Sequence, residues 1–280
     1  MKIEFTKMQG IGNDYIYIDC MKNDLSLTRE QIAFLSDRRF GIGGDGVIFI
    51  RKSEVADGYM DMYNLDGSAG KMCGNGVRCV GKYLYDNGYA KSGTVTVETR
   101  SGVKTLRMEI GANKKAAGAA VDMGKAELAC KNIPVLYDGS NVNIPVTVGG
   151  RDYLMTCVSM GNPHAVIFVE NPDDIPLEEV GPLFENSVLF PDKVNTEFAS
   201  VISRNHLNMR VWERGSGETL ACGTGACAVA VAAVLTGLCD MDTDITVTLR
   251  GGDLVINYKS DGTVTMTGGA ATVFCGSIEL

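Results

Sequence analysis

Residues 228–235 form an unbroken run of Ala, Val and Leu, and this run predicts a helix. Thr236-Gly237 follows it as a stop signal. Because the run is apolar on every side, we expect the helix to be buried all round. The sequence Cys222-Gly223-Thr224-Gly225 leads into it. This turn therefore places a cysteine and two glycines at the start of a buried helix.

Glycines at a helix start leave the first backbone N–H groups uncovered. Those groups and the positive end of the helix dipole form an anion site. The same field favours a thiolate. We therefore expect Cys222 to have a lowered pKa.

The chain contains a second copy of this arrangement. Cys73-Gly74-Asn75-Gly76 precedes a helical stretch at 80–85, which Asn87-Gly88 ends. Cys73 and Cys222 lie 149 positions apart (222 − 73), and other landmarks keep this offset over roughly 12–110 against 161–259. They are Gly12-Asn13 and Gly161-Asn162, Tyr63-Asn64-Leu65 and Trp212-Glu213-Arg214, Phe49 and Phe198, and Gly102 and Gly251. The chain is therefore predicted to fold as two similar halves, related by a pseudo-twofold axis.

Short alternating or apolar segments elsewhere indicate strands, and two further helices are expected at 28–37 and 177–185. Thr28 and Gln31 have capping-box spacing. We place the boundary near Asp122, with halves of 1–122 and 123–264. The predicted strands are 15–19, 47–50, 59–64, 95–97, 103–110, 144–148, 153–158, 165–169, 194–198, 207–212, 245–249, 254–258 and 264–267. The fold class is α/β (α+β).

Charge and hydropathy narrow the range of partners. The net charge of −8 on 280 residues, without a Lys/Arg cluster, argues against a nucleic-acid partner. The first residues alternate like a strand and lack an apolar signal core. No apolar run approaches the ~20 residues of a membrane span. We expect a cytoplasmic protein with no membrane partner.

The chain has nine cysteines, no Cys-x-x-Cys and only two histidines, His164 and His206. This is not typical of a secreted disulfide framework or a structural zinc site, so no metal is expected. Most of the cysteines are interpreted as small buried hydrophobes. They are Cys20, Cys79, Cys130, Cys157, Cys227, Cys239 and Cys275.

The segment Gly41-Ile42-Gly43-Gly44-Asp45-Gly46 formally matches G-x-G-x-x-G. A dinucleotide site needs a strand before this motif and a helix after it. Here a strand follows at 47–50 and no strand-like segment directly precedes it. We interpret the segment as a substrate-facing loop.

Two thiols from similar halves, each beside an anion site, suit reversible proton transfer at one carbon. One thiolate would remove a proton and the other thiol would deliver one to the opposite face. An amino acid Cα fits, with its carboxylate held by donors at Gly74, Asn75, Gly223 and Thr224.

The motifs that carry this chemistry resemble those of the diaminopimelate epimerase family. They are Gly12-Asn13-Asp14, Tyr63-Asn64-Leu65-Asp66-Gly67-Ser68, Met72-Cys73-Gly74-Asn75-Gly76, Gly161-Asn162-Pro163-His164, Val194-Asn195, Trp212-Glu213-Arg214-Gly215 and Ala221-Cys222-Gly223-Thr224-Gly225. The resemblance covers nearly the whole chain. It implies cofactor-independent epimerisation of LL-2,6-diaminopimelate to the meso form, a step of lysine biosynthesis. It also implies two domains, each a curved mixed sheet or barrel around a central helix, with the last strand (residues 265–280) returning to the first domain, and a homodimer.

Carried over by motif, Cys73 and Cys222 are the acid and base. Asn13, Asn64, Asn162 and Asn195 hold the substrate, and Glu213 and Arg214 read its amino and carboxylate groups. Other readings stay open: a solvated Glu213-Arg214 pair, asparagines that only form turns, and a packed or backbone-bonded His164. The chain departs from the family pattern at Gly46, where some members carry a substrate-contacting Gln, and at Lys71, where an acidic residue is common.

Three rivals remain. One is a cofactor-independent racemase of proline, hydroxyproline, histidine or a broad set of amino acids. Another is a thiol redox sensor that pairs Cys73 with Cys222. A pyridoxal enzyme is disfavoured.

Overall fold

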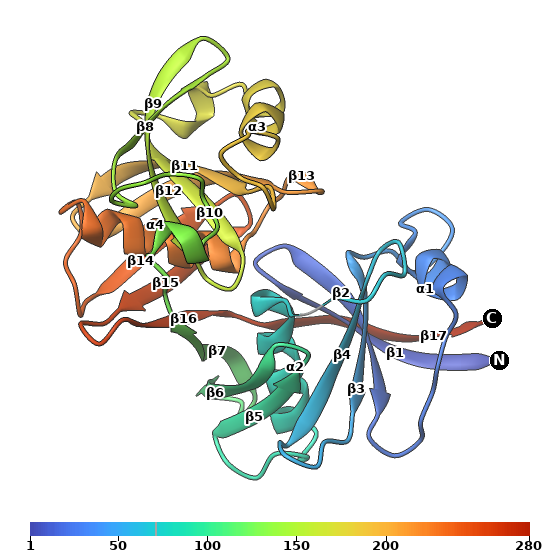
Figure 1. Cartoon of the computed structure of the whole chain (residues 1–280). Helices are drawn as coiled ribbons and strands as arrows, with labels where there is room; N and C mark the ends of the chain where they lie inside the picture. Colours follow the sequence, from blue (N-terminus) through green and yellow to red (C-terminus); the bar gives the residue numbers. More distant parts are fainter. Residues whose placement is uncertain (71) are drawn as a thin grey trace. The chain divides into compact units, whose positions relative to one another are not determined.

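The computed structural model describes residues 1–70 and 72–280, so Lys71 lies outside the described residues. The described chain is a mixed α+β structure with seventeen strands and four α-helices. It divides into two compact units. Unit 1 comprises Met1–Asp122 and Thr267–Leu280, and unit 2 comprises Met123–Met266. The blue-to-green and the yellow-to-orange segments of Figure 1 follow this division.

Unit 1 alternates hairpins with two helices. Its elements are β1 (Lys2–Gly10), β2 (Asn13–Cys20), α1 (Arg29–Ser36), β3 (Gly46–Arg51), β4 (Gly58–Asn64), α2 (Gly74–Asp86), β5 (Thr94–Thr99), β6 (Gly102–Ile110), the larger part of β7 (Ala116–Lys125), the end of β16 (Thr263–Gly269) and β17 (Ala271–Glu279). Thr28 caps α1, and its hydroxyl and the Gln31 side chain form the predicted capping box.

Unit 2 repeats this order. Its elements are η1 (Cys130–Asn132), β8 (Ile144–Val148), β9 (Arg151–Ser159), β10 (Pro163–Phe168), η2 (Pro172–Asp174), α3 (Leu177–Glu185), β11 (Asn195–Ser203), β12 (His206–Glu213), β13 (Gly217–Glu218), α4 (Gly223–Leu235), β14 (Asp244–Leu249), β15 (Gly252–Tyr258) and most of β16. The bounds of α4 are those of α2 shifted by 149 at both ends (223 − 74 and 235 − 86).

Strand pairing confirms the internal repeat. In unit 1, β1–β2 are antiparallel, β2–β3 parallel, β3–β4 antiparallel, β4–β5 parallel and β5–β6 antiparallel. In unit 2, β9–β10, β10–β11, β11–β12, β12–β14 and β14–β15 pair in the same order and directions. Each unit is thus built on the same sheet, and each sheet delivers a cysteine-containing turn between its fourth and fifth strands.

The C-terminal strand completes unit 1. In unit 2, β8 pairs with the outer side of β9. In unit 1, β1 is the counterpart of β9, and β17 pairs with it over Lys2–Gln9. The strand that closes the second sheet precedes it in the chain, whereas the strand that closes the first comes from the far end of the sequence. The single last strand expected at 265–280 is in fact two strands, β16 and β17, which are interrupted at Ala270.

Helix α2 begins at Gly74, well before the expected stretch at 80–85. Its first turn consists of the poor helix formers Gly74, Asn75 and Gly76, which hid the helical pattern, and the helix also carries two buried charged residues, Arg78 and Lys82. Tertiary contacts make their burial tolerable, because Arg78 Nε donates to the Gly269 carbonyl at 3.2 Å and Lys82 Nζ pairs with Asp86 at 2.7 Å. Helix α4 is nearly all apolar and buried, as predicted.

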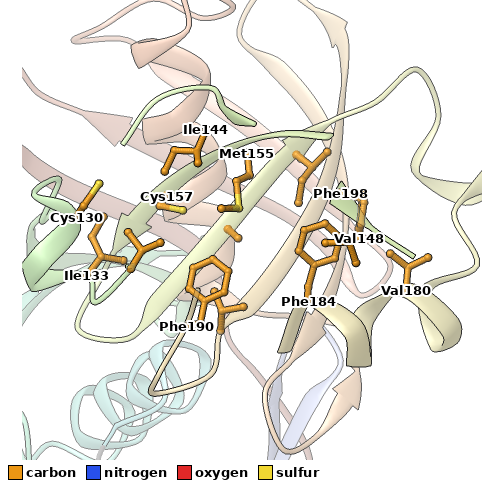
Figure 2. Close-up of a cluster of buried hydrophobic side chains, with 14 of the residues drawn as sticks. Cys130, Ile133, Ile144, Val148, Met155, Cys157, Val180, Phe184, Phe190 and Phe198 are labelled. Carbon is orange, nitrogen blue, oxygen red and sulfur yellow. The ribbon is translucent and has the colours of Figure 1, made fainter. Parts of the chain in front are cut away.

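Aromatic rings dominate one core of unit 2. Figure 2 shows Phe184, Phe190 and Phe198 in this cluster of buried side chains. The ring centroids of Phe184 and Phe198 lie 5.9 Å apart at 79°, an edge-to-face arrangement. Cys157 and Met155 pack in the same cluster. Each such side chain contributes about 1.5–3 kcal/mol when fully buried.

All nine cysteines are free thiols. Six of the seven interpreted as core residues are buried, but Cys275 is exposed, so that prediction was wrong for it. The reason is its strand: β17 is exposed along much of its length. None of the helices in the described residues is long and apolar enough to cross a membrane.

Gly181 of α3 should resist the usual helix-stabilising exchange to alanine. A Cβ there would lie 2.4 Å from the Trp212 ring. We expect Gly181→Ala to lower the free energy of unfolding by about 1–2 kcal/mol, because an overpacking penalty of about 1–3 kcal/mol exceeds a propensity gain of about 1 kcal/mol. Urea unfolding measures this. Gly93→Ala, whose Cβ would meet only Ile110 at 3.5 Å, is the control and should stay near wild type.

Candidate active site

Cys73 is the N-cap residue of α2, with extended backbone at φ −127° and ψ 121°. Two of the polar contacts of its sulfur have opposite effects on the charge of the thiol. It accepts a hydrogen bond from the Gly76 N–H at 3.3 Å, which favours a thiolate. It donates its proton to Asn13 Oδ1 at 3.1 Å, which favours the thiol. The predicted helix-start cysteine and Asn13 are therefore brought together.

Cys222 is the N-cap residue of α4 and is 4% exposed. Its sulfur lies 3.6 Å from Thr224 Oγ1. Burial raises the pKa of this thiol well above its ordinary value, and the carboxylates of Glu213 and Glu197 raise it further; hydrogen bonds from Thr224 and Gly225 only partly oppose them. The expectation of a lowered pKa was wrong. A helix start alone does not form a thiolate where water is excluded and two carboxylates lie close by.

Glu213 ends β12 and lies against the Cys222 turn. Its carboxylate accepts a hydrogen bond from the Thr219 hydroxyl. Burial raises the pKa of Glu213, while bonds to Thr219 and Cys222 lower it in part. Ionisation of either group therefore disfavours ionisation of the other. Glu213 interacts with the Cys222 turn and is not merely solvated.

Asn162 lies just before β10 and connects a buried pair to the α4 turn. Its Nδ2 lies 3.4 Å from Thr224 Oγ1, and its Oδ1 lies 3.1 Å from His164 Nε2. His164 Nδ1 lies 2.7 Å from Glu197 Oε1, and both side chains are fully buried. His164 is thus packed as expected, but its partners are side chains rather than backbone. Asn162 does more than form a turn.

Asn195 begins β11 and is 2% exposed. Its Oδ1 accepts the Arg214 N–H at 2.9 Å. Within residues 1–70 and 72–280, its Nδ2 has no hydrogen-bond partner. A buried amide donor left unpaired is costly unless a ligand supplies an acceptor. Asn195 is therefore the clearest sign of a ligand site in unit 2.

Glu185, the last residue of α3, holds the turn after β12 in place. Its carboxylate accepts from the Trp212 indole at 2.8 Å and from the Gly215 N–H at 3.1 Å, and pairs with Lys193 at 2.9 Å. Burial by itself would raise the pKa of Glu185, but these hydrogen bonds outweigh it and the pKa is lowered. Arg214 is exposed, and its guanidinium donates to the Asp192 carbonyl at 2.6 Å.

Asn64 and Gly46 form the other edge of the unit 1 site. Asn64 Nδ2 donates to Ser68 Oγ at 3.0 Å and its N–H to the Ser68 carbonyl, so the turn-forming role holds for it. Gly46 pairs with Asn64 across β3–β4. With φ +154°, a Cβ at Gly46 would lie 2.0 Å from the Tyr63 carbonyl, so no glutamine fits on this backbone. By the 149 offset, Asn195 is the counterpart of Gly46 in unit 2 (195 − 46).

Gly74 with Asn75, and Gly223 with Thr224, are the first two residues of α2 and α4. At these positions the backbone N–H groups have no acceptor within the helix. Each unit therefore presents a cysteine, the N–H groups of a helix start and an asparagine. This set can bind a carboxylate and move a proton at the adjacent carbon.

Sequence reasoning missed four supporting residues: Tyr15, Asp45, Glu185 and Glu197. Tyr15 is the counterpart of His164 (164 − 15) and lies beside Asn13 and Cys73. Its own burial, and then the charges of Cys73 and Asp45, raise its pKa well above 10. The repeat could have found Tyr15. Glu197 could have been found because it is a charged residue in an otherwise apolar strand, next to the core residue Phe198.

Comparison with known proteins identifies the family of this chain. The family model described as "Diaminopimelate epimerase" matches residues 5–129 and 156–273. The chain belongs to the diaminopimelate epimerase family. Membership confirms the resemblance drawn from the motifs and makes the chain an isomerase of the epimerase type.

Curated relatives match over their whole length. A diaminopimelate epimerase of Leptospira biflexa is 53% identical, covering 100% of both chains. One of Desulfovibrio desulfuricans is 54% identical, covering 98% of this chain and 97% of the relative, and one of Methanococcus maripaludis is 50% identical, covering 99% and 100%.

Solved structures share the family fold at low identity. A PhzF-family phenazine biosynthesis protein from Bacillus anthracis gives a TM-score of 0.72 at 17% identity, with full coverage of both chains. A probable proline racemase from Agrobacterium radiobacter gives 0.70 at 14% identity, covering 99% and 93%. These likenesses confirm the fold.

Glu185 should make stability sensitive to acid. Its pKa is lowered in the folded state, so its contribution is full above the unfolded-state pKa of about 4.3 and is lost as pH falls through the folded-state value. We expect Glu185→Gln to be less stable than wild type at pH 7, with the difference narrowing as pH falls from 6 to 3. Urea unfolding at each pH measures it. A constant difference across this range contradicts the assignment.

The charge of Glu213 should hold Cys222 in the thiol form. We expect Glu213→Gln to lower the pH at which Cys222 forms a thiolate, because the variant removes the nearest carboxylate charge. Thiolate ultraviolet absorbance, measured as the difference from Cys222→Ser, follows the titration. Glu218→Gln is the control, since Glu218 pairs with Arg210 and Arg250 instead. Equal titrations of both variants contradict this role.

Proposed function

We propose that this enzyme interconverts LL-2,6-diaminopimelate and meso-2,6-diaminopimelate by two-base proton transfer between Cys73 and Cys222, without a cofactor. Membership of the diaminopimelate epimerase family supports the reaction. The observation that carries the mechanism is the matched pair of N-cap cysteines, one on α2 and one on α4, at the same point of two repeated sheets.

Each helix start supplies what a poor carbon acid needs. The substrate carboxylate is bound by N–H groups at Gly74, Asn75, Gly223 and Thr224, which stabilise the negative charge that grows on it when Cα loses its proton. Removing one such donor typically raises the barrier by ~3 kcal/mol. These donors are fixed by the helices before the substrate binds, so no reorganisation is needed during the reaction.

The proton balance is simple. One cysteine, as thiolate, takes the Cα proton and becomes a thiol. The other, as thiol, gives its proton to the opposite face of the carbanion and becomes a thiolate. The two sulfurs exchange protonation states in each turnover, and the reverse reaction uses the same groups. In the free protein Cys222 is a thiol, because burial, Glu213 and Glu197 all raise its pKa, so the sulfur that acts as the base must lose its proton before the transfer begins.

The other polar side chains of the proposed site suit the second amino and carboxylate groups of diaminopimelate, at the end of the molecule that does not react. Asn13, Asn64, Asn162 and Asn195 provide amide groups, and Glu213 and Arg214 provide a carboxylate and a guanidinium. The unpaired Nδ2 of Asn195 supports binding of a carboxylate oxygen in unit 2. A shorter substrate such as proline has no second end to occupy these groups.

The protein is further proposed to act as a homodimer in the cytoplasm, in lysine biosynthesis. Val273 and Phe274 of β17 are 56% and 46% exposed, and such apolar side chains on a sheet support association. Sedimentation equilibrium measures the mass; a monomer at micromolar concentration rules out the dimer.

The test is deuterium incorporation at Cα from heavy water, in reduced protein without cofactor. We expect exchange and conversion of LL-diaminopimelate to the meso form. Cys73→Ser and Cys222→Ser should each lower turnover by roughly 10²- to 10⁴-fold, since each removes an acid–base group. Cys227→Ser, in the same helix as the Cys222 turn, is the matched control.

Exchange with L-proline or L-histidine in place of diaminopimelate assigns the protein to another racemase activity. Intact turnover in either cysteine variant contradicts the two-base mechanism. No exchange with any of these amino acids leaves a thiol redox sensor as the better explanation.

A further inference from the structure

The glycine-rich loop before β3 has no place in the chemistry so far, yet it reaches the unit 1 site. It is fixed at the end of α1, where the Gly43 and Gly44 N–H groups donate to the Leu35 and Ser36 carbonyls at 3.0 Å. A Cβ at Gly44 would lie 2.7 Å from Lys7 Nζ and 3.1 Å from the Asp14 carbonyl. The glycine therefore lets the loop lie against the start of β2 and brings Asp45 to Asn13.

Asp45 is joined to the start of β2 by several bonds. Its Oδ2 accepts from Asn13 Nδ2 at 2.6 Å and from the Asp14 N–H at 3.1 Å. Its Oδ1 accepts from Arg38 at 2.9 Å, and its own N–H donates to the Asp14 carbonyl at 2.7 Å. A carboxylate beside a guanidinium accepts hydrogen bonds and has none to donate. The end of the Asn13 amide that faces Asp45 must therefore be the NH₂ end.

This constraint decides what Cys73 meets. With its NH₂ held by Asp45, Asn13 turns its oxygen toward the Cys73 sulfur, 3.1 Å away. That oxygen can accept from a thiol and is unfavourable beside a thiolate. The opposite orientation would place an N–H donor there, in addition to the Gly76 N–H at 3.3 Å, and both contacts would then stabilise a thiolate.

We propose that Asp45 is a positioning residue that locks the Asn13 amide with its oxygen toward Cys73, and so keeps Cys73 in the proton-donating thiol form. The inference rests on the proposed role of Cys73 as one of the two proton-transferring thiols. It assigns the glycine-rich loop a part in acid–base control rather than in contact with a cofactor.

Other titratable groups near Cys73 do not supply this control. Tyr15 and Tyr17 of β2 and Cys79 of α2 face it. Burial raises the pKa of both tyrosines well above 10 and that of Cys79 to about 11, so all three stay neutral between pH 6 and 9. Among the described residues, Arg38, Asp14 and Lys7 are further charged groups of this cluster, and they act on Asn13 through Asp45 and the backbone.

The experiment measures alkylation of Cys73 by iodoacetamide in the full-length protein between pH 6 and 9, with the peptide that contains Cys73 quantified by mass spectrometry. Only the thiolate reacts. Releasing the Asn13 amide removes one hydrogen bond to the thiol. We therefore expect Asp45→Ala to speed alkylation at neutral pH by about two- to tenfold. Asp45→Asn keeps an acceptor for the Asn13 NH₂ and should restore wild-type rates.

Two controls separate positioning from loss of structure. Arg38→Gln breaks the ion pairs to Asp14 and Asp45 but leaves the Asp45–Asn13 bond, so its alkylation rate should match wild type. In an Asn13→Ala background, Asp45→Ala should have no further effect, because its effect passes through the amide. If Asp45→Ala does not fold, Asn13→Ala alone must speed alkylation by the same factor.

An unchanged Cys73 rate in Asp45→Ala, or an equal increase in Arg38→Gln, overturns the proposal. Because no substrate is used, this result is independent of whether the protein epimerises diaminopimelate. With active enzyme, Asp45→Ala should also lower kcat more than it raises KM, whereas Asp45→Asn should restore kcat.

Discussion

A cysteine at the N-cap of a buried helix is the arrangement on which both units depend. The helix start offers uncovered N–H groups to an anion and holds the sulfur beside them. Glycines after the cysteine are required because other groups come close: a Cβ at Gly225 would lie 2.7 Å from Glu197 Oε1 and 3.2 Å from the Cys222 sulfur. The sheets, the buried helices and the anchored turns all serve to place these two helix starts.

The two sites share a plan but differ in their charges. In unit 1, Asp45 and Arg38 hold Asn13, whose oxygen faces a partly exposed Cys73. In unit 2, a fully buried His164–Glu197 pair holds Asn162, and Cys222 is almost completely enclosed. The repeat gives both sulfurs the same backbone setting, and two-base chemistry needs one thiol and one thiolate only during turnover. The side chains around the two asparagines differ, with Tyr15 in unit 1 at the position that His164 occupies in unit 2.

Burying a polar group without a partner costs free energy, so the buried carboxylates of both units have several hydrogen-bond or ion-pair partners. Glu185 has three hydrogen-bond partners, and Asp61 of β4 pairs with both Arg51 and Arg100. Fully satisfied networks of this kind hold a site rigid, whereas a missing partner leaves a desolvated group. Asn195 differs from these residues, because among the described residues its buried Nδ2 has no hydrogen-bond partner, and this donor points to a ligand.

The sequence by itself determined the repeat, the two helix-start cysteines, most strands and the family, because the 149 offset, the Ala/Val helix and the motifs are local or periodic signals. Tertiary structure decided the rest. The pKa of Cys222 depends on burial and on the carboxylates of Glu213 and Glu197, which the folding of β11 and β12 brings close to it. The early start of α2 depends on partners that tolerate buried Arg78 and Lys82. The closure of unit 1 by β17 and the link from Asp45 to Asn13 join segments far apart in the chain, and no local pattern encodes such contacts.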